Sequence, residues 1–215
     1  MRTRMLLGTA VVTALFTAAP LTAASASSID VLTLGRTAGP NATVGDTVTA
    51  RMQVGTEATF YVPGSTTGVI CKQASTTSTI TANPSKPGVA GESLNGQSFS
   101  RCKTNIPGIT LEGIQITGLP YTVTVSGKSG HAVTVENAST TTTFGTPAGD
   151  IPCSYTDAAV NGVASNTDSL ITFTNQEFVL TPTSSTSCPP AADFSATFGP
   201  QKDVTVSPAM RVKVN

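Results

Sequence analysis

The feature that most constrains this chain is an alternation of apolar and polar residues with a period of two. In one segment, for example, Val48, Ala50, Met52 and Val54 fall on the same face. Successive side chains of a β-strand point to opposite sides, so this pattern predicts strands with one buried face. It recurs in three further segments: Ala58–Val62, Phe194–Phe198 and Met210–Val214.

Gly, Pro, Asn and Ser divide the chain into about a dozen such short segments, and helical periodicity is nearly absent. Short strands at this spacing predict an all-β fold, namely a disulfide-bonded antiparallel β-sandwich with Greek-key or jelly-roll-like connections. Of the 215 residues, 38 are Thr, whose branched side chain suits a pleated surface. We expect one sandwich domain over residues 27–215, with a two-part division near residue 146 as the alternative.

The first 26 residues have the composition of a cleaved signal peptide. Arg2 and Arg4 precede an apolar stretch, Met5–Ala19, and Ala24-Ser25-Ala26 offers a cleavage site of small residues. Cleavage after Ala26 predicts a secreted protein that is extracellular or loosely associated with the cell wall. No later segment has the length and apolarity of a membrane span, so none is expected in the mature protein.

Removal of this leader leaves ten basic and twelve acidic residues, a net charge of −2. A protein that binds nucleic acid neutralises phosphates with a surplus of Lys and Arg, which this chain lacks. The same balance argues against a polybasic membrane anchor. We therefore expect no nucleic-acid partner.

Four cysteines follow the leader: Cys71, Cys102, Cys153 and Cys188. An even number in an exported chain predicts two disulfides, for which three pairings exist. We favour Cys71–Cys102 and Cys153–Cys188 because they close the shorter loops, each contributing roughly 3.5 kcal/mol of stability. The spacings contain no close pair of the kind that binds zinc, and no metal or cofactor is expected.

The hairpin around residue 129 has a register that the sequence predicts. Paired residues must share a face, so Val125 should oppose Val133, and Val123 should oppose Val135. This register leaves Lys128-Ser129-Gly130 as a three-residue loop, with Gly at the position that needs a left-handed backbone.

Other irregular elements are also expected. A two-residue turn at Asn175-Gln176 would pair Phe173 with Phe178 in a second hairpin, and a slip in the apolar phase predicts a β-bulge at Gly113. Two stretches that contain Pro or many small residues are expected to be longer loops: Asn83–Gly91 and Asp157–Thr167.

The sequence offers little catalytic machinery, and we expect no catalytic residue. The only histidine, His131, follows a hairpin loop, and the nearby Ser129 lies in the turn, where it is poorly placed as a nucleophile. Gly64–Gly68 and Gly127–Ser129 each match only a fragment of a nucleophile or phosphate-binding loop. Four residues could ring a calcium ion but are more typical of turns and caps: Asp157, Asn161, Asn166 and Asp168.

Two signatures that contain cysteine carry a resemblance to other secreted chains. Cys102 is followed by Gly118-Leu119-Pro120, and Cys188-Pro189-Pro190 precedes Phe194–Pro200. In these features the chain resembles a group of uncharacterised secreted proteins of actinomycete bacteria. The resemblance covers most of the mature chain and implies an exported all-β protein without a catalytic residue.

These observations favour a secreted, non-catalytic protein that acts as a structural or interaction module of the extracellular space or cell envelope. Its partner, an envelope or extracellular protein or a glycan, would contact three loops: Asn83–Gly91, Gly127–Gly130 and Asp157–Thr167. One alternative is a carrier of a small apolar ligand, held in a cavity lined by Phe60, Ile116, Phe173 and Phe178. A less favoured alternative is a hydrolase with two facing carboxylates.

Overall fold

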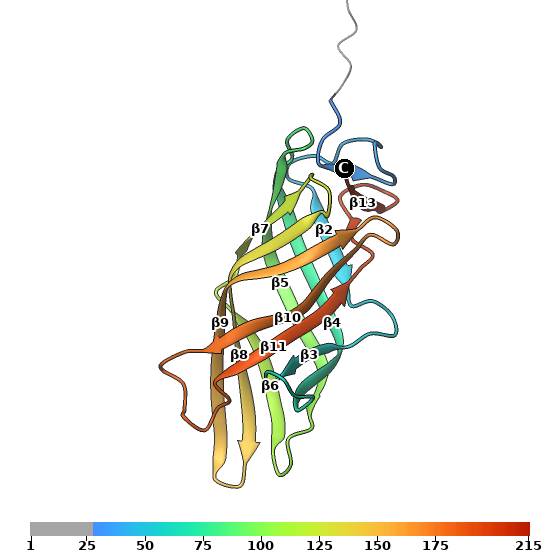
Figure 1. Cartoon of the computed structure of the whole chain (residues 1–215). Coiled ribbons are helices and arrows are strands. Elements are labelled where there is room, and N and C mark those ends of the chain that lie inside the picture. Colours follow the sequence, from blue (N-terminus) through green and yellow to red (C-terminus); the bar gives the residue numbers. More distant parts are fainter. Residues whose placement is uncertain (1–27) are drawn as a thin grey trace, which may run out of the picture.

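The computed structural model describes residues 28–215, so the expected signal peptide lies outside the described residues. Every regular element in this range is a β-strand (Figure 1). The strands are β1 (Leu32–Leu34), β2 (Thr47–Arg51), β3 (Ala58–Tyr61), β4 (Gly68–Ala82), β5 (Val89–Thr104), β6 (Thr110–Thr117), β7 (Tyr121–Ser126), β8 (Ala132–Thr146), β9 (Gly149–Ser165), β10 (Leu170–Leu180), β11 (Ala191–Phe198), β12 (Lys202–Asp203) and β13 (Met210–Val214). Within residues 28–215, no helix has the length and apolarity needed to cross a membrane.

The strands form one antiparallel sheet that folds over on itself. Neighbours follow the order β1-β13-β12-β2-β4-β3-β11-β10-β9-β8-β7-β5, and β6 pairs with β8. An additional pairing of β4 with β5 closes the strands from β4 round to β5 into a ring. In Figure 1, β10 and β11 cross in front of β4 and β5, so two layers face each other with the core between them. The predicted all-β, disulfide-bonded antiparallel sandwich is confirmed.

Both disulfides have the predicted pairing. Cys71 of β4 and Cys102 of β5 lie opposite each other in the β4–β5 ladder, with a Cα–Cα distance of 3.9 Å. Cys153 of β9 is bonded to Cys188, which precedes β11, over a Cα–Cα distance of 5.7 Å. The first bridge links two strands that are already paired, whereas the second holds the loop 181–190 against β9.

The hairpin of β7 and β8 has the predicted register, and its turn has the predicted glycine. Gly130 has a φ of 91°, in the left-handed region that glycine enters without steric cost. The irregularity expected near Gly113 is also present, since the β6–β8 register shifts between Leu111 and Gly113. The valine pairs of the β7–β8 hairpin are Val123–Val135 and Val125–Val133.

The prediction of a second hairpin with its turn at Asn175-Gln176 is wrong. Leu170–Leu180 form one continuous strand, β10, which lies between β9 and β11. Asn175 has a φ of 47° and belongs to a bulge, because the register with β11 shifts between Phe173 and Gln176. One extra residue in the strand moves the side chains that follow it to the opposite face of the sheet. Phe173 and Phe178, five residues apart, are therefore both buried on the same side.

The prediction of a long loop at Asp157–Thr167 is also wrong. β9 continues to Ser165, and only the turn 166–169 connects it to β10. Ladders to β8 and β10 on either side hold this stretch of small residues as a strand. The loop before β5 is shorter than expected because β5 begins at Val89. The strand predicted to reach Val54 ends earlier, and that side chain is 93% exposed.

Candidate functional site

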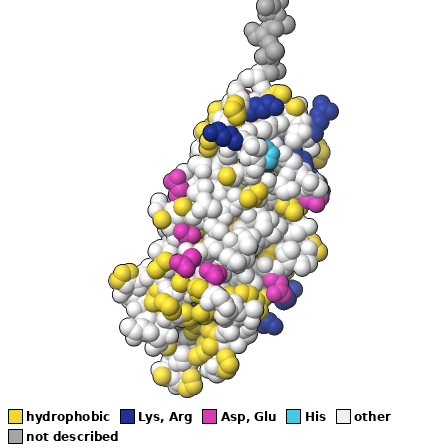
Figure 2. Space-filling view, in the orientation of Figure 1, with side chains coloured by type: hydrophobic (Ala, Val, Ile, Leu, Met, Phe, Trp, Pro, Cys, Tyr) yellow, Lys and Arg dark blue, Asp and Glu magenta, His cyan; other side chains and the backbone are white. Residues whose placement is uncertain are grey.

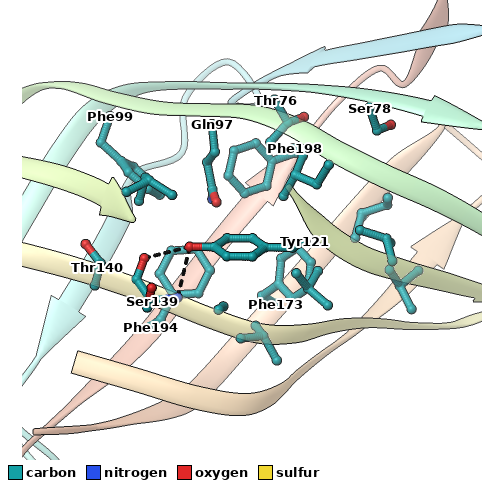
Figure 3. Close-up of a pocket in the computed structure, with 18 of the residues that line it drawn as sticks. Thr76, Ser78, Gln97, Phe99, Tyr121, Ser139, Thr140, Phe173, Phe194 and Phe198 are labelled. Carbon is teal, nitrogen blue, oxygen red and sulfur yellow. Dashed lines mark hydrogen bonds between the residues drawn. The ribbon is translucent and has the colours of Figure 1, made fainter. Parts of the chain in front are cut away.

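A cavity of about 80 Å³ lies between the two layers of the sheet (Figure 3). Alternation along the strands of both layers turns their apolar side chains toward it. All four residues expected in a ligand-carrying interior line this cavity: Phe60, Ile116, Phe173 and Phe178. Phe99, Phe194 and Phe198 add three further aromatic rings to its wall.

Phe194, in the middle of β11, is the centre of the aromatic cluster. Its ring centroid lies 4.9 Å from that of Phe60 and 6.0 Å from those of Phe99, Phe173 and Phe178. The rings of Phe99 and Phe178 meet it edge to face, with interplanar angles of 84° and 83°. This is a favourable arrangement for aromatic pairs, so the rings support one another around the cavity.

The cavity is bordered on one side by a gap in the hydrogen bonding of the sheet. β6 pairs with β8, whereas β5 beyond Leu94 pairs with β4 alone, and no ladder joins β5 to β6 in the described chain. Gln97 and Phe99 of β5 and Ile116 of β6 line the cavity along this gap and are partly exposed. We therefore place the entrance to the cavity between these two strands.

Tyr121 forms a fixed polar part of the wall. Its buried hydroxyl contacts the carbonyl oxygens of Thr117 and Ser139, and it accepts a hydrogen bond of 3.0 Å from the Ser139 amide. The Ser139 hydroxyl in turn donates to the Thr117 carbonyl oxygen at 2.7 Å. These bonds, part of which Figure 3 shows, fasten the corner between β6 and β7 to β8. The hydroxyl of Tyr121 is thus already occupied by the protein.

Among the described residues, Glu92 of β5 is the one charged side chain that lines the cavity. Ser78 of β4 donates a hydrogen bond of 2.5 Å from Oγ to Oε2 of Glu92. Burial raises the pKa of the Glu92 carboxyl above its ordinary value, and the hydrogen bond from Ser78 acts in the opposite direction. Because a loop is expected up to Gly91, Glu92 is not assigned to the interior from the sequence. The signal that could have done so is its spacing of two residues from the buried Ala90 and Leu94, which places all three on the same face of β5.

The residues considered for catalysis from the sequence do not line the cavity. His131 directly follows the β7–β8 turn, and its Nδ1 is buried without a hydrogen-bond partner within residues 28–215. Ser65 lies in the turn between β3 and β4, where its hydroxyl accepts a hydrogen bond from the Thr67 amide. The Lys128-Ser129 pair is exposed at the tip of the β7–β8 hairpin.

The oxygen-bearing residues considered for calcium are spread along β9 and the turn that follows it. Asp157 and Asn161 lie in β9, and Asn166 and Asp168 lie in the turn 166–169. The amide of Asn166 is engaged by both backbone groups of Val214, at 2.6 and 2.9 Å. Among residues 28–215, no three His, Cys, Asp or Glu side chains come together to hold a metal. From the part of the chain that the structure describes, one carboxyl lines the cavity, whereas the hydrolase alternative requires two.

The arrangement provides an aromatic cavity with an entrance between two strands and, among the described residues, one carboxyl in its wall. Comparison of the chain with family models, with curated proteins and with solved structures found no match in any of the three. The functional inference therefore rests on the geometry of this chain.

Proposed function

We propose that this protein binds a small apolar ligand in the cavity between its two layers. The observation that carries this proposal is the cavity of about 80 Å³ lined by phenylalanine rings. Protein interiors are close-packed, with few voids larger than a water molecule. The atoms that line such a void lack contacts on one side, and an apolar group that enters it supplies them.

We further propose that binding takes place outside the cell or in the cell envelope. The predicted leader supports export, and the two disulfides are compatible with an oxidising compartment, where such bonds persist. An apolar molecule that crosses an aqueous space gains from an enclosed site, because its surface is then removed from water. A secreted carrier with an interior cavity meets this requirement.

Filling the cavity tests the proposal. Ala138 of β8 lines the cavity, so Ala138→Leu would place a larger apolar side chain inside it. We expect the purified protein to bind hexan-1-ol in calorimetry, and this variant to lose about tenfold or more in affinity, since each buried CH₂ counts for ~0.8 kcal/mol.

Ala159→Leu, at an exposed position of β9, is the matched control and should leave hexan-1-ol affinity unchanged. Absence of binding by the unaltered protein would contradict the proposal. Equal affinity of the protein and the Ala138→Leu variant would contradict the location of the site.

The second candidate function is the interaction module, which one feature of the fold favours. The Gly127 amide donates a hydrogen bond of 2.9 Å to the Gly88 carbonyl oxygen, so the β7–β8 tip and the β4–β5 loop lie together. Lys86 and Lys128 are exposed in these two loops. Figure 2 shows that most of the Lys and Arg side chains visible on this face lie near the end that carries the C-terminus. An anionic envelope glycan would suit this end of the molecule. Retention of the protein by purified cell wall tests this candidate, and we expect the K86E/K128E variant to lose that retention.

A further inference from the structure

We propose that the ligand of the cavity is an amine, with a slender apolar body and a protonated amino group that pairs with Glu92. This inference rests on the proposed function and names the class of ligand that the same cavity takes. Within residues 28–215, Glu92 is the single carboxyl in a lining made mainly of aliphatic and aromatic side chains.

The carboxyl of Glu92 lacks a cationic partner in the protein. Oε2 accepts the hydrogen bond from Ser78, whereas Oε1 accepts none from the described residues. The ion pair found within residues 28–215 joins Lys72 to Glu57 and leaves Glu92 without one. A carboxylate taken out of water is unfavourable unless a counter-charge and hydrogen bonds replace its hydration. An ammonium group supplies both in one contact.

The surroundings of Glu92 also suit an ammonium group. Gln201 lines both voids that Glu92 lines, and its side-chain Oε1 accepts no hydrogen bond from the described residues. An ammonium has three protons to donate, so one acceptor in addition to the carboxylate increases the complementarity. The hydroxyl of Tyr121 is already bonded to the Ser139 backbone.

The shape of the cavity limits the body of the ligand. The residues of β5 that line it run from Glu92 to Phe99, a stretch of strand about 20 Å long. A volume of about 80 Å³ is small, which favours an alkyl chain over a fused ring system. Glu92 also lines a second void of about 20 Å³ that Gln97 and Phe99 do not reach. The carboxyl therefore lies where the two voids meet, at the opposite end of this stretch of β5 from Gln97 and Phe99.

A set of three probes of equal chain length tests the inference. We expect the purified disulfide-bonded protein to bind hexylamine about tenfold or more tightly than hexan-1-ol at neutral pH, as a charge-assisted hydrogen bond allows. Hexanoate should bind most weakly, because its charge repels that of Glu92. Calorimetric titration of each probe measures these affinities.

Two variants assign the preference to Glu92. Glu92→Gln keeps the size of the side chain but removes its charge, so it should lose the preference for hexylamine and keep hexan-1-ol affinity within about twofold. Glu136→Gln, at an exposed position of β8, is the matched control and should keep the preference. Circular dichroism verifies that each variant is folded. If Glu92→Gln does not fold, the comparison of probes on the unaltered protein decides the inference by itself.

The outcomes separate this inference from the proposed function. Equal or tighter binding of hexan-1-ol than of hexylamine would overturn the amine and leave the small apolar ligand in place. A preference for hexylamine that persists in Glu92→Gln would overturn the role of Glu92. Binding of none of the three probes would overturn both the inference and the proposed function.

Discussion

Ser78 of β4 and Glu92 of β5 lie diagonally across the β4–β5 ladder, and the Ser78 hydroxyl donates a 2.5 Å hydrogen bond to Oε2 of Glu92. Both side chains point into the cavity between the layers. Burial disfavours the ionised carboxylate and raises the pKa of Glu92, while the single hydrogen bond from Ser78 lowers it. Since burial is the larger effect, folding favours the protonated form of Glu92, and the stability of the protein depends on pH through this residue.

Glu92→Gln should therefore change the pH dependence of stability. The contribution of Glu92 is fully present below its ordinary pKa of 4.5 and is lost as the pH rises through the higher pKa of the folded state. We expect the variant to match the protein at pH 4 and to have a larger free energy of unfolding at pH 8. Urea unfolding at both pH values measures this. Among residues 28–215, the other ionisable side chain that lines either of the two voids of Glu92 is that of Tyr121. A variant that is less stable than the protein at pH 8 would contradict the prediction.

Phe194→Ala should be among the most destabilising single substitutions in this protein. The side chain is 4% exposed, and its ring contacts four other phenylalanines. Truncation removes these contacts and enlarges the cavity, for which the expected loss in unfolding free energy is about 3–5 kcal/mol. Val179→Ala on the exposed face of β10 is the control and should change it by less than about 0.5 kcal/mol. A loss below about 1 kcal/mol for Phe194→Ala would show that the cluster does not carry the core.

The sequence predicts which face of a strand each side chain occupies more readily than it predicts where the strand begins and ends. Facing is a local property of an extended chain, so Phe194, Ala196 and Phe198 are correctly assigned to the core from their spacing alone. The extent of a strand depends on partners that are distant in sequence. Residues 157–165 carry small and polar side chains typical of a loop, and they form a strand because β8 and β10 lie on either side.

The residues of the candidate site, too, can be predicted from the sequence only in part. Phe60 and Phe173 can be placed in the interior from alternation, and the structure puts both on the cavity wall. The bulge at Asn175, which brings Phe178 to the same side as Phe173, depends on the register with β11. Whether space remains between the rings depends on packing in three dimensions, which no local pattern encodes. The inward position of Glu92 is visible in the sequence only once β5 is known to begin at Val89.

Removal of the Cys153–Cys188 disulfide should have a local as well as a global effect. Replacement of both cysteines by Ala should lower the free energy of unfolding by about 3.5 kcal/mol, as expected for a closed loop of this length. The loop 181–190 keeps few other ties to β9, among them the bonds from the Ser154 amide to Ser184 Oγ and from the Thr181 amide to the Ser154 carbonyl oxygen. We therefore expect faster hydrogen exchange in this loop.

The double replacement of Cys71 and Cys102 by Ala is the comparison for this effect. It should lower stability by a similar amount without a local increase in exchange, because β4 and β5 remain paired on both sides of the bridge. Faster exchange throughout both variants, with no difference between the loop and the strands, would contradict the local role of the Cys153–Cys188 bridge.

Tyr155 of β9 should make the protein sensitive to strongly alkaline pH. Its side chain is 4% exposed, its hydroxyl donates to the Pro189 carbonyl oxygen at 3.2 Å, and burial raises its pKa to about 12. The stabilising contribution of the neutral phenol is present below pH 10 and is lost as the pH rises through about 12. Tyr155→Phe should therefore lose less stability between pH 10 and 12 than the unaltered protein. Absorbance of phenolate at 295 nm should contain a component with a midpoint of about 12 that is absent in the variant, and the same titration in concentrated urea gives the unfolded reference. A component of Tyr155 that titrates near pH 10 in the folded protein would show that its hydroxyl is open to water.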